Sequence, residues 1–183
     1  GLKLNIIDVD PSITYGEIER KKKETIDKLK KEGLFFYQAK LYLSPIIKRI
    51  ALIGSPNTSG HRDFLDELFS NEIFRNFKVK EFPCSVQGEK AKAEILSQIS
   101  EARQYNVDVI VILRGGGSKM DLNVFNDYEI CKEICLSPIP VMTGIGHESD
   151  EVVADLVCRM SHITPTAIAK HFYTSIGIFS GHL

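Results

Sequence analysis

Short apolar runs alternate with segments of helical periodicity along most of this chain, and this alternation limits the possible folds more than any other feature. Short, continuously apolar runs are typical of strands that are buried on both faces, as in parallel sheets. The segments between the runs are long enough to carry the helices that connect parallel strands. The expected strands are Arg49–Ile53, Phe77–Phe82, Val107–Leu113 and Ile139–Thr143.

Helices are expected around these strands. Right-handed crossovers favour an α/β fold, an open parallel sheet flanked by helices with the flavodoxin-like or Rossmann-like strand order 2-1-3-4. We expect residues 1–47 to form an N-terminal strand–helix extension or linker and residues 48–183 to form the α/β domain. The extension is expected to hold a strand at Leu2–Val9, broken by Pro11, and a helix at Glu17–Glu32. The other expected helices are one around Phe64–Phe69, then Glu89–Tyr105, Leu122–Leu136, Val152–Val157 and Thr166–Tyr173.

The composition excludes several classes of protein. With 43% hydrophobic and 26% charged residues, the 183-residue chain has the profile of a soluble globular domain. No apolar stretch approaches the roughly 20 residues of a membrane span, and no signal peptide is visible. The four cysteines form no CxxC pair, so reduced thiols in a cytoplasmic protein are expected.

Positive charge is concentrated near the N-terminus, although the net charge of the chain is only −1. Residues 1–50 hold 11 of the 23 Lys and Arg residues and 7 of the 24 Asp and Glu residues. The run Arg20–Lys23, continued by Lys28, Lys30 and Lys31, is therefore a candidate nucleic-acid contact. The same pattern is typical of a solvated helix face, and the sequence leaves both interpretations open.

Two glycine-rich loops follow expected strands. Arg114-Gly115-Gly116-Gly117-Ser118 comes directly after Val107–Leu113, and the loop Gly144–Asp150 comes after Ile139–Thr143. Consecutive glycines let the backbone turn and leave its N–H groups free to face an anion, to which Arg114 adds a two-pronged donor. A tight strand-to-helix turn is the alternative interpretation of the first loop.

The loops are expected to meet at one place. In a sheet of order 2-1-3-4 the ligand crevice lies at the carboxyl ends of the strands, between the first and third strands along the chain. The loops Gly54–Arg62, Arg114–Ser118 and Gly144–Asp150 converge there, and none of them contains Phe, Tyr or Trp. The expected phosphate or DNA contacts are Ser55, Ser59, Gln87, Gly115, Gly116, Gly117 and Ser118.

The titratable groups of this crevice suit proton transfer beside a phosphate. Arg114 can clamp a phosphoryl oxygen, His147 can carry a proton near neutral pH, and Asp150 can orient that histidine. Asp63 lies in the first turn of the helix that follows the first loop. Simpler interpretations stay open: Asp63 can complement the helix dipole, His147 can be structural, and Asp155 is either a supporting acid or a cap.

A set of short motifs runs along nearly the whole chain: Glu32-Gly33-Leu34-Phe35, Arg62-Asp63, Val86-Gln87-Gly88, Arg114-Gly-Gly-Gly-Ser, Asp121-Leu-x-x-Phe125-Asn126, Ile139-Pro140-Val141, Gly146-His147-Glu148-x-Asp150, Ala154-Asp155 and Thr164-Pro165-Thr166-Ala167. In this order and spacing they resemble the large subunit of bacterial exodeoxyribonuclease VII. The chain departs from the family at Arg159-Met160-Ser161, where many members carry an acid and an arginine.

The resemblance implies an enzyme that degrades single-stranded DNA from either end to acid-soluble oligonucleotides. It implies a cytoplasmic assembly of one large subunit with several small subunits, and makes residues 48–183 the catalytic domain. The small subunits bind through a helical region absent from this chain, and the grip on DNA comes from that assembly and from an absent oligonucleotide-binding domain. No membrane partner is implied. The family's catalytic positions fall on Asp63, Arg114, His147 and Asp150.

We therefore expect phosphodiester hydrolysis. Arg114 and the glycine amides hold the scissile phosphate, His147 acts as base or acid, and the two aspartates orient His147 or water. Mg²⁺ held by the carboxylates and the histidine is an alternative, and the sequence leaves the metal open. The rival functions are a non-catalytic nucleotide- or phosphate-binding α/β module and a structural domain whose loops only pack.

Overall fold

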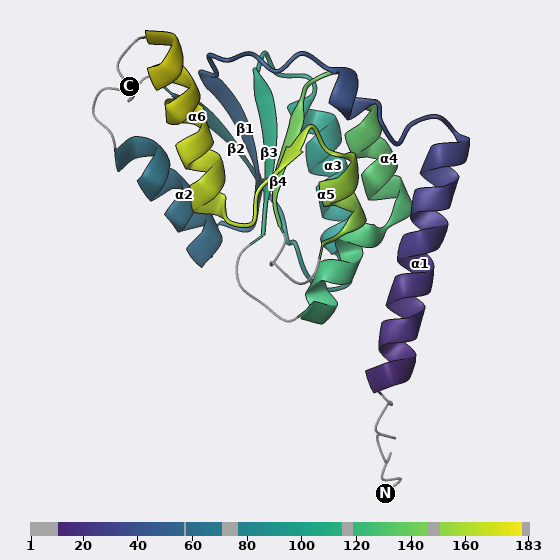
Figure 1. Cartoon of the computed structure of the whole chain (residues 1–183). Helices are drawn as coiled ribbons and strands as arrows, with labels where there is room; N and C mark the ends of the chain where they lie inside the picture. The colour runs from purple at the N-terminus through teal and green to yellow at the C-terminus, as the bar shows by residue number, and fades with distance from the viewer. Residues whose placement is uncertain (1–10, 57, 71–76, 115–118, 146–150, 181–183) are drawn as a thin grey trace, which may run out of the picture.

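The computed structural model describes residues 11–56, 58–70, 77–114, 119–145 and 151–180. Its centre is a five-stranded sheet in which every pair of neighbouring strands is parallel, with the order β2-β1-β3-β4-β5 (Figure 1). This confirms the predicted α/β fold and its order 2-1-3-4. The strands are β1 (Arg49–Gly54), β2 (Lys78–Pro83), β3 (Val109–Leu113), β4 (Val141–Gly144) and β5 (Met160–Ser161).

Helices cover both faces of the sheet. Figure 1 shows α2 and α6 together on one face, and α3, α4 and α5 on the other, with α1 outside them. The helices are α1 (Pro11–Lys31), α2 (Ser59–Ser70), α3 (Ala91–Ala102), α4 (Tyr128–Leu136), α5 (Val153–Val157) and α6 (Pro165–Ser180), with 3-10 helices η1 (Gln38–Lys40) and η3 (Lys119–Asn126). None of the helices in the described part of the chain is long and apolar enough to cross a membrane.

The sheet separates two hydrophobic cores. Successive side chains of a strand point to opposite faces, so one strand supplies both cores. On β1, Ala51 and Ile53 pack in the core shared with α3, α4 and α5. Ile50 and Leu52 pack in the core shared with α2 and α6. All of β3 is buried, which explains why its sequence reads as an unbroken apolar run.

The structure differs from the sequence expectations in the start of one helix and in the presence of one further strand. The helix expected at Glu17–Glu32 begins earlier, at Pro11, because the fixed φ of proline suits the first position of a helix. The strand expected at Leu2–Val9 lies outside the described residues. The edge strand β5 was not expected, because two residues carry too little periodicity to be recognised.

The single helix expected over Leu122–Leu136 is wrong. The segment forms the 3-10 helix η3 and the α-helix α4, with Asp127 extended between them at φ −67° and ψ 131°. The Asp127 side chain accepts a hydrogen bond from the N–H of Glu129 at 2.9 Å and so caps α4. Asn126 supplies tertiary bonds at the break: its carbonyl accepts from Thr25 Oγ1, and its Oδ1 accepts from the N–H of Val153.

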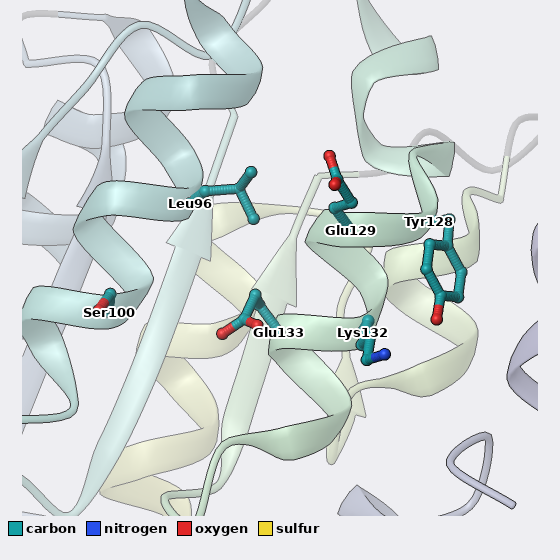
Figure 2. Close-up of a pocket in the computed structure, with 6 residues that line it drawn as sticks. All are labelled: Leu96, Ser100, Tyr128, Glu129, Lys132 and Glu133. Carbon is teal, nitrogen blue, oxygen red and sulfur yellow. The ribbon is translucent and has the colours of Figure 1, made fainter. Parts of the chain in front are cut away.

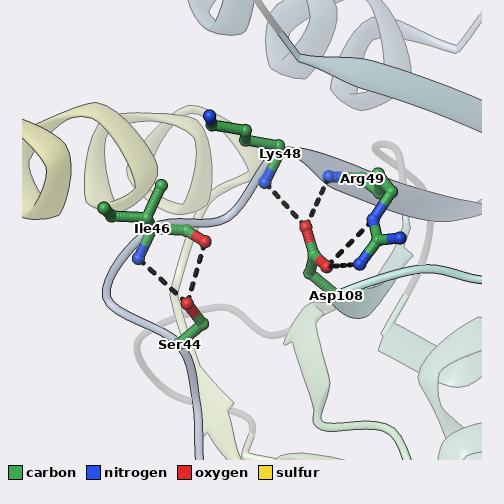
Figure 3. A network of polar contacts seen from close by, with 5 residues as sticks. All are labelled: Ser44, Ile46, Lys48, Arg49 and Asp108. Carbon is green, nitrogen blue, oxygen red and sulfur yellow. Dashed lines mark hydrogen bonds and ion pairs between the residues drawn. The ribbon is translucent and has the colours of Figure 1, made fainter.

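A carboxylate fixes the start of β1 against β3. Asp108 Oδ2 accepts hydrogen bonds from the N–H groups of Lys48, at 2.9 Å, and Arg49, at 2.8 Å (Figure 3). Its Oδ1 accepts from Arg49 Nε at 3.1 Å. Burial acts to raise the pKa of Asp108, but the hydrogen bonds from Arg49 and Lys48 outweigh it and hold the pKa below 3.8.

The connector, residues 32–48, joins α1 to β1 across the amino ends of the strands (Figure 1). Gln38 is fully buried and holds the connector in place. Its Nε2 donates to the carbonyls of Ile134 and Ser137 at the end of α4, and its Oε1 accepts from the N–H of Val141 at the start of β4. One side chain therefore satisfies three backbone groups that would otherwise be buried without partners.

The substitution Gln38→Met keeps the side-chain volume but removes all three of these bonds. We expect a loss of roughly 3 kcal/mol or more in the free energy of unfolding, because each orphaned buried polar group costs about 1–3 kcal/mol. Urea denaturation measures the loss, with Gln104→Met, at an exposed position, as the control. An equal, small effect of the two substitutions would contradict this role.

The substitution Asp108→Asn tests the carboxylate at the start of β1. A carboxyl group whose pKa is lower in the folded state stabilises the fold above its unfolded pKa and loses this contribution as the pH falls. The wild type should therefore be more stable than Asp108→Asn at neutral pH, and the gap should shrink as the pH falls below 3.8. Denaturation at several pH values measures the gap. The exposed Asp27→Asn variant is the control, and a gap that widened in acid would refute the assignment.

Candidate functional site

The carboxyl ends of three strands meet at one edge of the sheet. Ile53 of β1 pairs with Ile112 of β3, and Leu113 of β3 pairs with Gly144 of β4. Just past this point the N–H of Arg114 donates to the carbonyl of Gly144 at 3.2 Å. The half-buried Arg114 thus follows the carboxyl end of β3, next to the junction of β1 and β3 where the sequence predicts the crevice.

Glycine at the end of β4 lets α6 approach this edge closely. A Cβ at Gly144 would lie 2.9 Å from Ile168 Cδ1 and 3.0 Å from Leu113 Cδ2. The next nearest atom would be Cα of Pro165, the first residue of α6, at 3.6 Å. The beginning of α6 therefore packs directly against the carboxyl end of β4, on the face of the sheet that α6 and α2 cover.

The loop after β1 is ordered by its own hydroxyl groups. Ser55 Oγ donates to the carbonyl of Cys84 at 2.8 Å and accepts from the N–H of Val86 at 3.3 Å, so it joins the ends of β1 and β2. Thr58 Oγ1 donates to the carbonyl of Ser55 and accepts from the N–H of His61, which makes Thr58 the cap of α2. Ser59 is exposed as the first residue of α2.

Asp63 lies one turn into α2 and its side chain is exposed. The helix begins at the edge where β1 ends, so its first turns face the same region as Arg114. The neighbouring His61 turns away from this region, because its Nε2 lies 3.0 Å from the carboxylate of Glu81 on β2. Asp63 is therefore the acid that α2 offers to solvent at its N-terminal end.

Gln87 is exposed on the loop between β2 and α3. Gly88 follows it with φ +85°, a left-handed conformation that favours glycine. The N–H of Ser85 donates to Glu94 Oε2 at 2.7 Å, and this bond lowers the pKa of Glu94. The loop is thus tied to the first turn of α3, and the Gln87 side chain is open to a ligand.

The remaining predicted site residues lie outside the described residues. These are Gly115, Gly116, Gly117, Ser118, His147 and Asp150. Their grouping with Asp63 and Arg114 stays a prediction from the sequence.

A buried polar network lies beneath the end of β4, and only part of it was singled out from the sequence. Thr143 Oγ1 donates to Asp155 Oδ1 at 2.6 Å and lies 3.4 Å from Cys158 Sγ. Burial raises the pKa of Asp155, although the bond from Thr143 opposes this. The network ties α5 to β4. The sequence analysis singled out Asp155 alone, and a threonine within an otherwise apolar strand is the signal that could have added Thr143.

The other candidate groups offer less chemistry. The four cysteines are free and buried, and burial raises the pKa of Cys84, Cys135 and Cys158 to about 12. A thiolate at these positions is therefore strongly disfavoured. Among the residues that the structure describes, no group of three or more His, Cys, Asp or Glu side chains is placed to hold a metal ion.

A surface hollow of about 460 Å³ lies elsewhere, on helices α3 and α4 (Figure 2). Tyr128 at its side donates through its hydroxyl to Glu32 at 2.7 Å, and Lys28 lies 3.5 Å from the centre of the tyrosine ring. These contacts attach α1 to α4. Among the described residues the hollow is lined by α3 and α4 alone, so it lies apart from Asp63 and Arg114.

Comparison with known proteins places this geometry in a family. The family model described as "Exonuclease VII, large subunit" matches residues 34–179. The exodeoxyribonuclease 7 large subunit of Clostridium tetani is 38% identical over 145 residues, which are 79% of this chain and 36% of that protein. The large subunit of Thermotoga maritima is 36% identical over 156 residues, 85% of this chain and 39% of that protein.

A relative from Campylobacter jejuni with the same name is 33% identical over 165 residues, which are 90% of this chain and 42% of that protein. The chain thus spans about two fifths of the length of the curated relatives it matches. The matched stretch contains the whole sheet, with Arg114 at its carboxyl edge, and the chain belongs to the exonuclease VII large-subunit family.

Proposed function

We propose that this chain carries the catalytic site of an exodeoxyribonuclease that hydrolyses phosphodiester bonds in single-stranded DNA and releases oligonucleotides. The observation that carries the proposal is the position of Arg114, held by the carbonyl of Gly144 where β1, β3 and β4 end. A guanidinium at this point of an open α/β sheet suits a phosphate group of a ligand in the crevice. The names of the relatives support the same reaction.

The proposed chemistry divides among four side chains. Arg114 and the amides of the glycines after it bind the scissile phosphate and stabilise the charge that grows on its oxygens. His147 removes a proton from the attacking water or donates one to the leaving oxygen. Asp63 and Asp150 orient the histidine or the water.

Ser55, Ser59, Gln87 and Ser118 are proposed to contact the DNA or phosphate around this centre. Thr58 and Ser55 preorganise the start of α2 through bonds within the loop, so the exposed Ser59 is the hydroxyl best placed for a ligand. A helix N-terminus adds favourable partial charge for a phosphate.

Mg²⁺ is a second way to stabilise the same charge. The two aspartates with His147 offer oxygen and nitrogen ligands, and a bound Mg²⁺ would polarise the phosphate directly. Activity measured with and without a chelator decides between a metal-assisted site and one in which Arg114 and the amides act alone.

The proposal includes the setting of the enzyme. We infer a cytoplasmic large subunit that acts on single-stranded DNA together with small subunits, which bind through a region outside this chain. A non-catalytic nucleotide- or phosphate-binding module is the less favoured alternative, because it leaves His147 and Asp150 without a role.

Two substitutions test the site in the assembled protein. Asp63→Asn and Arg114→Lys should each lower the rate of release of acid-soluble nucleotides by about 100-fold or more, the usual cost of removing a group that acts in the transition state. Asp66→Asn is the matched control, because Asp66 is exposed on the same helix.

The rival functions predict different outcomes. A binding module would lose affinity in Arg114→Lys and show no hydrolysis in the wild type. A scaffold would lose neither affinity nor activity in any of the three variants. His147→Ala should abolish hydrolysis and leave binding of DNA intact if the enzyme assignment is right.

A further inference from the structure

Exposed apolar side chains gather on the connector. Nine large apolar side chains are exposed among the residues whose burial the structure describes, and four of them fall within residues 36–46. Phe36 is 63% exposed, Tyr37 43% and Tyr42 79%. Ile46 is the fourth. Because three of the four are aromatic, the surface offers flat rings more than a general apolar patch.

The backbone that carries these rings is held in place. The N–H of Tyr37 donates to the carbonyl of Leu34 at 2.9 Å, and Gln38 anchors the next residue to α4 and β4. Further along, the carbonyl of Leu41 accepts from Arg159 Nε at 3.0 Å. Rings presented from an ordered segment lose little conformational entropy when a ligand stacks on them.

Positive charge accompanies the rings. No Asp or Glu occurs from Gly33 to Arg62, whereas Lys40 lies within the aromatic segment and Lys31 just before it. Both lysines are exposed, and neither forms an ion pair with another residue in the described part of the chain. Lys30 lies 5.0 Å from the centre of the Phe35 ring, which itself contacts Phe36 edge to face.

Three acids on or next to segments that contact the connector are already engaged. Glu32 accepts from the hydroxyl of Tyr128 and lies 3.5 Å from Lys132. Glu133 accepts from Arg103, and Asp108 pairs with Arg49. With these three acids paired, the exposed lysines of the connector favour an anionic partner.

We propose that the connector surface, formed by Lys31, Phe36, Tyr37, Lys40 and Tyr42, binds single-stranded DNA outside the catalytic crevice. Bases stack on the rings while the lysines contact the backbone phosphates, the combination used for sequence-independent binding of single strands. Tyrosine also occurs at protein interfaces, but lysine is depleted there, so the pairing of rings with lysines favours nucleic acid. The inference rests on the proposed function for its substrate class.

The position of this surface predicts how it acts. The connector crosses the amino edge of the sheet, whereas Arg114 follows the carboxyl end of β3 (Figure 1). A five-residue parallel strand spans about 17 Å, so one DNA strand must pass the sheet to reach both places. The connector surface therefore binds DNA far from the bond that is cut. Only DNA strands long enough to reach both the connector and Arg114 bind more tightly because of it.

A titration of labelled oligo(dT) against the 183-residue chain, at one fixed salt concentration, tests the stacking. Tyr42→Leu and Phe36→Leu keep apolar area but remove the aromatic face. Each should weaken binding of an oligonucleotide of about 16 nucleotides by about fivefold or more, since a stacked base contributes about 1–3 kcal/mol. Tyr42→Phe should bind within about twofold of the wild type.

Two further measurements sharpen the test. Tyr15→Leu removes an exposed aromatic ring from the start of α1 and should leave affinity unchanged. Lys40→Gln should reduce the slope of log affinity against log salt by about 0.7, the value for one phosphate contact on a single strand. Circular dichroism of each variant checks that the fold is intact.

Normal affinity in Tyr42→Leu would overturn the inference. The inference would also be overturned if the variants at Phe36 and Tyr42 changed the sedimentation of the chain but not its affinity for oligo(dT). The surface would then be an interface with another protein molecule. Failure of the proposed function gives a different result. If the wild-type protein binds DNA through Tyr42 but hydrolyses none, the enzymatic function is refuted and the proposed DNA-binding surface is retained. Conversely, Asp63→Asn should bind the oligonucleotide as the wild type does and lose hydrolysis, which tests the proposed function without touching the connector surface.

Discussion

The structure depends on the pairing of β3 between β1 and β4. Every residue of Val109–Leu113 is buried, so this strand has no polar side chain to offer and its backbone groups must bond to the strands beside it. The parallel register brings the three strand ends to one edge. Chemistry can begin only where the apolar strands stop, and Arg114 is the first residue past that point. The position of the site is thus a consequence of how the centre of the sheet is built.

The parts of the fold that were predictable from the sequence are those governed by burial on both faces. The four long strands and their order could be predicted because an unbroken apolar run has few other environments, and because right-handed crossovers restrict the order. The position of the crevice is predicted from the strand order, and the structure brings the carboxyl ends of β1, β3 and β4 together at that place. Arg114 directly follows a strand, as the sequence predicts. Asp63 is expected in the first turn of its helix, but α2 has no acid in its first turn, and Asp63 lies just past it because the helix begins at Ser59.

The parts that were not predictable depend on bonds between distant residues. The break at Asp127 requires Asn126 to bond with Thr25 and Val153, which lie far away in the sequence. Gln38 looks like an ordinary surface glutamine in the sequence, because its three partners lie on α4 and β4. The residues next to a position in the sequence do not reveal partners that lie far away along the chain.

The carboxyl and amino ends of the strands present different side chains for the proposed binding of DNA. At the carboxyl edge the crevice loops contain no Phe, Tyr or Trp, so they can bind phosphate but cannot stack a base on an aromatic ring. At the amino edge the connector has rings and lysines but lacks an acid of its own between Gly33 and Lys48 to assist hydrolysis.

A single phosphate bound only at Arg114 would be released readily in salt, because few counterions are displaced. A strand bound also at Tyr42 leaves only when both contacts open, which raises the effective concentration of its phosphates at the crevice. If DNA binds at the connector and is cut at the crevice as proposed, the crevice can release its products while the remaining strand stays bound at the connector.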